Sequence, residues 1–217
     1  MSRREFVPAA ARDVFLPLYD PIVRLMGFDS VRRELVSRAN IEAGQRILDI
    51  GCGTGTLVVK LKRQYTAAQV VGLDPDAKAL QRAHIKAARA GVSVELEQGF
   101  ADELPYQSES FDRVFSSFMF HHLNTQEREN MLREVLRVLK PGGSFHLVDF
   151  TVADASHSLF DRLFRSHAQM KDNSDERILE LLSGTGFTNP VKVKEANMLL
   201  GLLHGAHYQA SARPPSC

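Results

Sequence analysis

The first segment of this sequence with residues suited to chemistry is a glycine-rich turn. A buried-strand pattern over residues 46–50 runs directly into GCGTG at residues 51–55, the glycine loop, and a segment of helical period begins near Thr56. Glycines let the backbone turn sharply and approach a ligand closely, beside the free amide groups of a helix start. Strand, glycine loop and helix together predict a nucleotide pocket, although a glycine-rich turn alone is weak evidence.

A carboxylate follows the next strand pattern. The run VVGLD at residues 70–74 places Asp74 at the carboxyl end of a strand, about 20 residues after the glycine loop, where it can accept both ribose hydroxyl hydrogens. A dehydrogenase fingerprint would need a third glycine at position 56, where this chain has Thr56. The spacing therefore argues against a nicotinamide cofactor and makes an oxidoreductase the less favoured reading.

Several segments resemble one enzyme family. ILDIGCGTG at residues 47–55 resembles motif I of class I S-adenosylmethionine-dependent methyltransferases. GFADELPY at 99–106, SFDRV at 110–114 and EVLRVLKPGG at 134–143 resemble its ubiquinone/menaquinone-type branch, with methyltransferase domains of the 11/25 kind. The resemblance covers residues 40–150. It implies S-adenosylmethionine as the cofactor and S-adenosylhomocysteine as the product.

The resemblance also implies roles for single residues. It assigns the methionine end of the cofactor to the end of the first strand and the glycine loop: Asp49, Gly51, Cys52, Gly53 and Gly55. Asp74 would hold the ribose, and Pro75 would lie near the adenine. Cys52 is expected to be a small apolar filler rather than a nucleophile.

The adenine contact departs from the family pattern, because Phe100 stands where an aspartate usually follows the glycine at position 99. Either Phe100 packs on the purine while Ala101 supplies a backbone hydrogen bond, or Asp102 reaches across. Ser116, at the end of the fourth strand, completes the expected cofactor site. Tyr19 lies in an amino-terminal segment that often folds over the pocket in resembling enzymes, where its phenol could either contact the methionine carboxylate or pack on the surface.

Two histidines are candidates for proton transfer. His121 and His122 follow the fourth strand, at the carboxyl edge where ligands gather in parallel sheets. One of them could act as a general base, or both could pack against Phe118 and Phe120. Asp149, at the end of the fifth strand, either holds a loop or binds the acceptor.

The chemistry that the resemblance implies needs little from the protein. A sulfonium makes its methyl carbon electrophilic without a metal, so no metal site is expected, and the protein must align the acceptor and exclude water. A phenol or an activated carbon would also need a base, whereas an amine or a thiolate would not. An Asn-Pro-Pro-Tyr type segment after the fourth strand would favour methylation of base nitrogens or glutamine amides. This chain has SSFM at residues 116–119 instead, so neither reaction is expected.

These residues need a sheet to position them. Strand patterns at 46–50, 69–74, 92–98, 113–117 and 144–150 alternate with helical segments, which is typical of α/β architecture. Two further strands, 191–195 and 202–209, are expected to form an antiparallel pair around a turn at Asn197. The resemblance implies a Rossmann-like three-layer αβα sandwich with a seven-stranded, mostly parallel sheet, order 3-2-1-4-5-7-6, whose last strand is antiparallel.

Two further helices are predicted. The clearer one runs from Thr125 to Leu139, with a capping box of Asn124 and Glu127 and a stop signal KPGG at 140–143. The other spans residues 156–169, and its phenylalanine stripe either covers core or lines an acceptor pocket.

Composition limits the remaining possibilities. A chain of 217 residues fits one domain, here divided into a helical cap at 1–40, a methyltransferase domain at 41–210 and a loose tail at 211–217. The net charge of +1 gives no nucleic-acid footprint, and no apolar run is long enough for a membrane span. Two cysteines favour a reducing, cytoplasmic setting. A monomer or a homodimer is expected.

The leading hypothesis is therefore an S-adenosylmethionine-dependent methyltransferase with a small-molecule acceptor. The alternative is a regulatory protein that binds S-adenosylmethionine or S-adenosylhomocysteine and transfers nothing.

Overall fold

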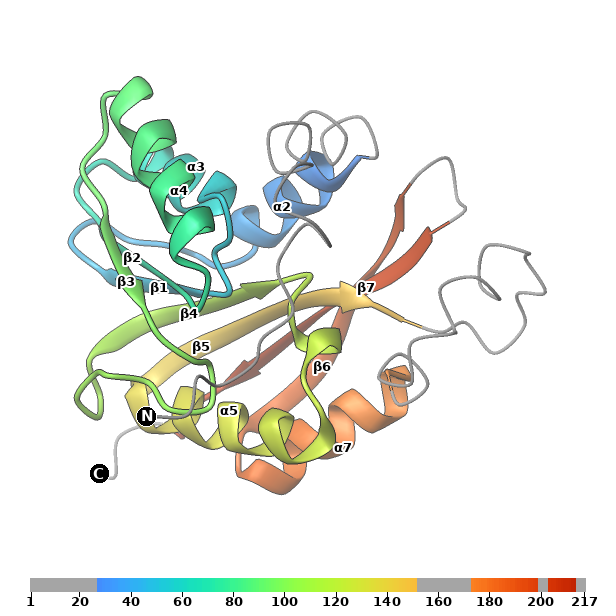
Figure 1. The fold of residues 1–217 in the computed structure, drawn as a ribbon. Helices are drawn as coiled ribbons and strands as arrows, with labels where there is room; N and C mark the ends of the chain where they lie inside the picture. Colours follow the sequence, from blue (N-terminus) through green and yellow to red (C-terminus); the bar gives the residue numbers. More distant parts are fainter. Residues whose placement is uncertain (1–26, 152–172, 199–202, 214–217) are drawn as a thin grey trace, which may run out of the picture.

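A seven-stranded sheet runs through the molecule in the order β3-β2-β1-β4-β5-β7-β6 (Figure 1). The computed structural model describes residues 27–151, 173–198 and 203–213. Neighbouring strands from β3 to β5 are parallel, and β7 runs antiparallel to both β5 and β6. The predicted strand order and the antiparallel last strand are confirmed.

The strands of this sheet are β1 (Arg46–Ile50), β2 (Gln69–Asp74), β3 (Glu95–Gln98), β4 (Phe111–Ser117), β5 (Leu139–Phe150), β6 (Thr188–Met198) and β7 (Leu203–Ser211). The helices are α2 (Phe28–Ser37), α3 (Thr56–Gln64), α4 (Ala77–Arg89), α5 (Thr125–Val138) and α7 (Asp175–Thr185), with a 3-10 turn η2 (Phe120–His122). Tyr19 and the predicted helix at 156–169 lie outside the described residues.

The helices cover the two faces of the sheet in separate groups (Figure 1). On one face, Leu35 of α2 and Leu57 of α3 pack with Ile47 and Val148 of the strands. On the other face, residues of α5 and α7 such as Val135 and Leu182 pack with further strand residues. This is the predicted three-layer sandwich.

Helix α5 begins as predicted. The Asn124 side chain accepts a hydrogen bond from the Glu127 amide, and the Glu127 side chain accepts one from the Asn124 amide, so the capping box is complete. The residues KPGG after the helix form an irregularity inside β5, since Leu139 pairs with Phe111 and Ser144 with Arg113.

Several boundaries differ from the sequence prediction, among them the starts of β4 and β5, which lie two and five residues earlier than predicted. β3 begins at Glu95, three residues later than predicted. Asn197 pairs with His204 inside the β6–β7 ladder, so it does not form the predicted turn. β7 extends to Ser211, and the Ala212 amide donates to the Gly143 carbonyl, so the chain stays on the sheet past the expected boundary at 210.

The parallel register brings the carboxyl ends of β1, β2 and β4 to one edge of the sheet, with Asp49 opposite Gly72 and Phe115. Ligands of open α/β sheets bind at this edge. No helix in the described ranges is long and apolar enough to cross a membrane.

Candidate active site

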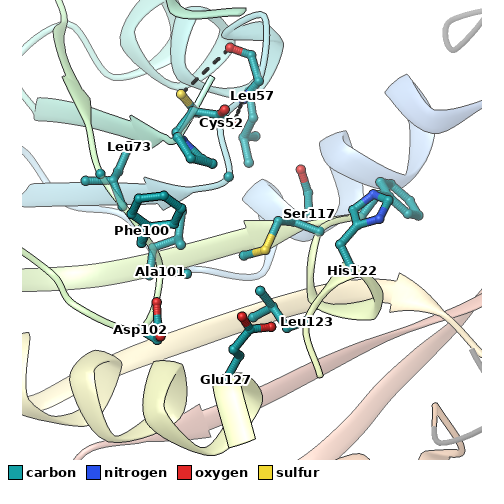
Figure 2. A pocket seen from close by; sticks show the side chains of 18 of the residues that line it. Cys52, Leu57, Leu73, Phe100, Ala101, Asp102, Ser117, His122, Leu123 and Glu127 are labelled. Atoms are coloured by element: carbon teal, nitrogen blue, oxygen red, sulfur yellow. Dashed lines mark hydrogen bonds between the residues drawn. The ribbon is translucent and has the colours of Figure 1, made fainter. Parts of the chain in front are cut away.

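A cavity of about 350 Å³ opens at the carboxyl ends of β1, β2 and β4 (Figure 2). Its walls come from the glycine loop, the end of β2, the residues after β3, the end of β4 and parts of α2 and α5. Its volume is within the range typical of small-molecule sites. In the described part of the chain, no group of three or more histidine, cysteine or acidic side chains is placed to hold a metal.

The glycine loop takes a backbone shape that other residues rarely adopt. Gly51, Gly53 and Gly55 have φ values of 71°, 53° and 76°. A Cβ atom at Gly55 would lie 2.7 Å from the Cβ of Ala83, so this glycine also lets α3 and α4 approach closely. The amides of Gly51 and Cys52 both donate to the Leu73 carbonyl, which ties the loop to β2.

Asp74 joins the glycine loop to the end of β2. Its Oδ2 accepts from the Gly53 amide at 2.8 Å, and its Oδ1 accepts from the Asp76 amide at 2.9 Å. Burial raises the pKa of Asp74 to about 6, against the effect of these two hydrogen bonds. Each oxygen keeps a further lone pair, so the fixed carboxylate can still accept hydrogen bonds from a ligand.

Asp49 of β1 lies two residues before the glycine loop and is almost fully buried, with 1% of its surface exposed. Neither carboxylate oxygen has a hydrogen-bond partner among the described residues. Burial raises the pKa of Asp49 to about 8, while the Arg32 guanidinium acts in the opposite direction. A buried carboxylate without a partner is costly, and a ligand cation would relieve that cost.

Arg32 of α2 also lines the cavity, and the sequence analysis missed it. Its Nε is buried without a hydrogen-bond partner in the described structure, and its guanidinium lies 5.8 Å from the centre of the Phe118 ring. The missed signal was periodicity. Arg32 shares one helix face with Phe28, Leu35 and Val36, all buried, and an arginine within an apolar stripe is unusual.

The segment after β3 forms another wall of the cavity. Figure 2 shows Phe100, Ala101 and Asp102 on one side of it and His122 on the other. The Gly99 amide donates to the Asp74 carbonyl, which holds this wall near the ribose candidate. Phe100, Ala101 and Asp102 are therefore all within reach of one ligand, so both sequence alternatives for the adenine remain open.

Cys52 lines the cavity but is not suited to attack a substrate. Its thiol is buried and points to the Gly53 carbonyl at 3.9 Å (Figure 2). Burial and the nearby carboxylates raise the pKa of Cys52 well above its usual value. The thiol therefore stays protonated, which agrees with a filler role.

The two histidines of η2 have different surroundings. His122 lines the cavity, whereas His121 packs beside it with the ring centres 4.0 Å apart. His121 Nδ1 lies 2.6 Å from Oδ1 of Asp149, and the His121 amide donates to Oδ2 of Asp149 at 2.7 Å. Asp149 is fully buried and also accepts from the Phe150 amide.

An aromatic cluster supports the wall next to these histidines. Phe118, which lines the cavity, has a φ of 57°, an unfavourable value for this residue type. Its ring packs against Phe28 at 4.4 Å and Phe150 at 5.1 Å between ring centres. The cluster therefore holds the chain where β4 ends and η2 begins.

Most of the residues predicted for the site lie in the cavity wall: Gly51, Cys52, Gly53, Asp74, Pro75, Phe100, Ala101 and His122. Asp49, Gly55 and His121 lie directly behind it. Ser116 is fully buried, and Ser117 lines the cavity instead, because side chains alternate between the faces of β4. Tyr19 is outside the described residues. The residues that the sequence analysis missed in the wall include Arg32, Met119, Leu123 and Glu127.

The chain is similar to known proteins in sequence. A family model described as a methyltransferase domain matches residues 47–143. A demethylmenaquinone methyltransferase from Lactobacillus johnsonii is 28% identical over 215 residues, 87% of each chain. One of the same name from Deinococcus radiodurans is 34% identical over 156 residues, which cover 70% of this chain and 63% of that protein.

Solved structures show the same fold at lower identity. Phosphoethanolamine N-methyltransferase 2 from Haemonchus contortus, in complex with S-adenosyl-L-methionine, gives a TM-score of 0.77 at 20% identity, over 96% of this chain and 59% of that one. The [4+2]-cyclase SpnF gives 0.71 at 20% identity, over 86% of this chain and 81% of that one. The fold therefore carries more than one named activity, and the reaction has to be argued from the site.

Proposed function

The chain belongs to the class I S-adenosylmethionine-dependent methyltransferases, and from this premise we propose that it methylates a small molecule at an atom that gives up a proton. The observation that carries the proposal is the His121–Asp149 pair directly behind the cavity wall. The relatives named demethylmenaquinone methyltransferase support a small-molecule acceptor.

The residues of the cavity fit the cofactor. The unpartnered carboxylate of Asp49 suits the methionine ammonium group, and Arg32 suits the methionine carboxylate. Asp74 is fixed to accept from the ribose. A Cβ atom at Gly53 would meet nothing within 4 Å, which leaves free space beside the loop. When bound, S-adenosylmethionine supplies an electrophilic methyl carbon without a metal.

Asp149 determines which nitrogen of His121 can take a proton. A carboxylate at 2.6 Å from Nδ1 favours the tautomer with the hydrogen on Nδ1 and leaves Nε2 with a free electron pair. The same carboxylate stabilises the imidazolium formed when Nε2 accepts a proton. His122 in the cavity wall would then contact the acceptor, and His121, whose ring centre lies 4.0 Å from that of His122, would receive the proton at Nε2 through it.

The wall next to His122 combines apolar and polar side chains. Phe118, Met119 and Leu123 line it together with Ser117, Asn124 and Glu127. Apolar side chains exclude water and favour a flat or apolar acceptor over a strongly hydrated one. A cytoplasmic setting, a monomer or homodimer and the absence of nucleic-acid partners remain predictions.

Thermal unfolding tests the cofactor assignment. S-adenosylmethionine and S-adenosylhomocysteine should each raise the melting temperature, because a ligand at 100 times its dissociation constant stabilises by about 2.7 kcal/mol. NAD serves as the control and should give no shift. A shift with NAD alone would contradict the site described above.

Methyl transfer to a panel of phenols, quinols and amines tests the reaction. Asp149→Asn keeps the shape of the side chain but alters the tautomer preference, so it should lower kcat by about 100-fold with unchanged cofactor affinity. His121→Gln should cause a similar loss, and His84→Gln, at an exposed histidine, should cause none. Cofactor binding without transfer to any acceptor would favour the regulatory alternative.

A further inference from the structure

The wall that contains Phe100, Ala101 and Asp102 belongs to a segment without regular structure. Between the end of β3 and the start of β4, residues 99–110 form neither helix nor strand. Such a segment has no ladder of backbone hydrogen bonds to fix it. Its shape therefore depends on contacts from elsewhere in the fold.

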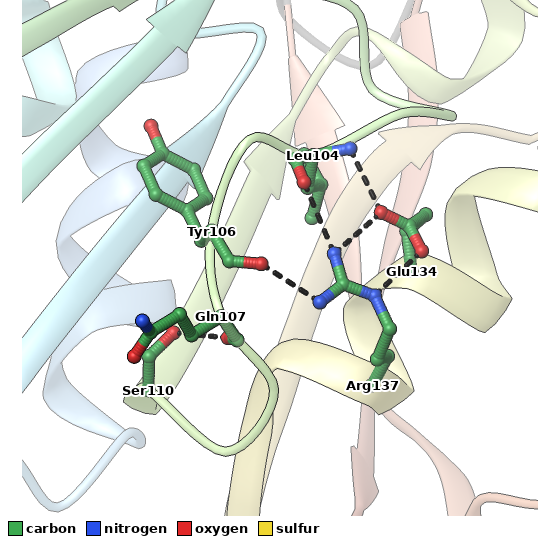
Figure 3. A network of polar contacts seen from close by, with 6 residues as sticks. All are labelled: Leu104, Tyr106, Gln107, Ser110, Glu134 and Arg137. Atoms are coloured by element: carbon green, nitrogen blue, oxygen red, sulfur yellow. Dashed lines mark hydrogen bonds and ion pairs between the residues drawn. The ribbon is translucent and has the colours of Figure 1, made fainter.

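Two side chains of α5 supply these contacts (Figure 3). Arg137 donates to the carbonyl oxygens of Tyr106 and Leu104, at 2.7 and 3.0 Å. Glu134 accepts from the Leu104 amide at 2.8 Å. Glu134 and Arg137 also bind each other through two hydrogen bonds of 2.7 Å each. The pair therefore holds both peptide groups of Leu104.

Apolar contacts fix the same two residues of the segment. The Leu104 side chain is buried in the core under α5. The Tyr106 ring packs edge-on against Phe111 with ring centres 5.0 Å apart. Leu104 is only two residues from Asp102, so a shift at Leu104 would move the cavity wall.

We propose that Glu134 and Arg137 are positioning residues for cofactor recognition, because they hold the 99–110 segment in the shape that distinguishes adenine from other bases. The proposal rests on the cofactor site proposed above. Neither residue lines the cavity, so both act through Leu104 and Tyr106. The hydrogen bonds from Arg137 lower the pKa of Glu134, against the opposing effect of burial.

Helix α5 provides a matched control. Arg133 and Glu129 form an ion pair of 3.0 Å on the same helix, with 57% and 37% of their side-chain surfaces exposed. Arg133 also donates to Asn130, again within α5. This pair has the same chemistry as Glu134 and Arg137, but the hydrogen bonds described for it stay within α5 and do not reach the 99–110 segment.

The experiment compares two ligands that differ only in the base. Dissociation constants for S-adenosylhomocysteine and S-inosylhomocysteine, its hypoxanthine analogue, are measured by calorimetry for the wild type and for Arg137→Met, Glu134→Gln and Arg133→Met. The wild type should prefer adenine by about tenfold, the effect of one hydrogen bond of about 1.4 kcal/mol. Arg137→Met should reduce this preference to about threefold or less, and Arg133→Met should keep it.

Glu134→Gln retains the size of the side chain and guards against a folding defect, and it should also reduce the preference. A simple loss of stability would lower the melting temperature but leave the ratio of the two constants unchanged. An unchanged ratio in Arg137→Met and Glu134→Gln, or a wild type that binds both ligands equally, would overturn the proposal. A wild type that binds neither ligand would instead overturn the proposed cofactor site, and this inference with it.

Discussion

One face of the sheet contains two buried polar groups of opposite chemistry. The first is Asp49 of β1, close to Arg32 of α2. The second is the pair His146 of β5 and His207 of β7, with 0% and 3% of their surfaces exposed and ring centres 5.7 Å apart. In both groups, ring or carboxylate atoms are buried without a hydrogen-bond partner among the described residues.

The same physical effect acts on both groups with opposite sign. Burial raises the pKa of Asp49 to about 8, and it lowers the pKa of His146 to about 3 and that of His207 to about 4. In each case the neutral form is favoured, because a charge in an apolar interior lacks solvation. Desolvation alone therefore does not identify a functional residue.

The difference between the groups lies in their access to a ligand. Asp49, His146 and His207 are all absent from the residues that line the cavity, but Arg32 beside Asp49 does line it, and Asp49 lies two residues before the glycine loop that forms one of its walls. A ligand cation can compensate the carboxylate, but no cavity wall reaches the histidines. We therefore expect Asp49 to affect binding and the histidines to affect stability.

The largest effect should come from the cofactor end. Asp74→Ala removes a fixed carboxylate from the ribose position and leaves the Gly53 amide without its acceptor. Charge-assisted hydrogen bonds contribute about 1.5–3 kcal/mol each, so the dissociation constant of S-adenosylhomocysteine should rise by about 100-fold or more. Calorimetry measures this change, with Glu42→Ala, at an exposed acidic residue outside the cavity wall, as the control. Equal affinity in both variants would mean that the ribose lies elsewhere.

The second effect is a pH dependence of binding. Below pH 8, Asp49 of the free protein is mostly protonated, and a bound ammonium group favours its ionised form. Binding then releases a proton, so affinity for S-adenosylmethionine should increase by up to tenfold per pH unit from pH 6.5 to about 8. Asp49→Asn has the same ligand titration without the carboxylate, so its profile should be flatter. If affinity depended on pH in the same way in the wild type and in Asp49→Asn, Asp49 would not interact with the ligand ammonium group.

The sequence predicted more of the cavity wall around the glycine loop than of the rest of the wall, for a physical reason. The strand β1, the glycine loop and helix α3 are contiguous in the sequence, and Asp74 is the last residue of the next strand, β2. Local sequence patterns are therefore enough to predict where these residues lie. Arg32 and the His121–Asp149 pair come from segments far apart in the chain, and only the packed sheet brings them together. The sequence placed Ser116 in the site, but the neighbouring Ser117 lines the cavity. Which of two neighbouring strand residues faces the cavity depends on the register of the sheet.

The third effect concerns stability at the second buried group. The pKa of His207 is about 4 in the folded state and near 6.5 when unfolded, so the unfolded chain takes up the proton first. Its contribution to stability is full above pH 6.5 and is lost as the pH falls toward 4, by about 1.4 kcal/mol per pH unit. Asn at position 207 does not titrate. His207→Asn should therefore flatten the pH dependence of the unfolding free energy by that slope.

Urea unfolding at several pH values measures this slope. The raised pKa values of Asp49 and Asp74 act in the opposite direction, since acidification relieves their buried charges. Both carboxylates are unchanged in His207→Asn, so the difference between the two proteins reports His207 together with its electrostatic effect on His146. The affinity for S-adenosylhomocysteine should stay the same. Weaker binding in His207→Asn would mean that the buried histidines also affect the ligand site, which contradicts the distinction between them and Asp49.

The smallest effect should come from the charges that α2 places near His207. Arg38 lowers the pKa of His207 and Glu34 raises it, but burial is the larger cause. Arg38 and Glu34 form an exposed ion pair of 2.7 Å, which water and salt screen. Arg38→Ala should leave stability at pH 7 unchanged and raise the pKa of His207 by less than about one unit. NMR titration of the histidine ring measures the shift, and removing Glu34 as well should cancel most of it. A larger shift would mean that the charges of α2, rather than the apolar interior, keep His207 neutral.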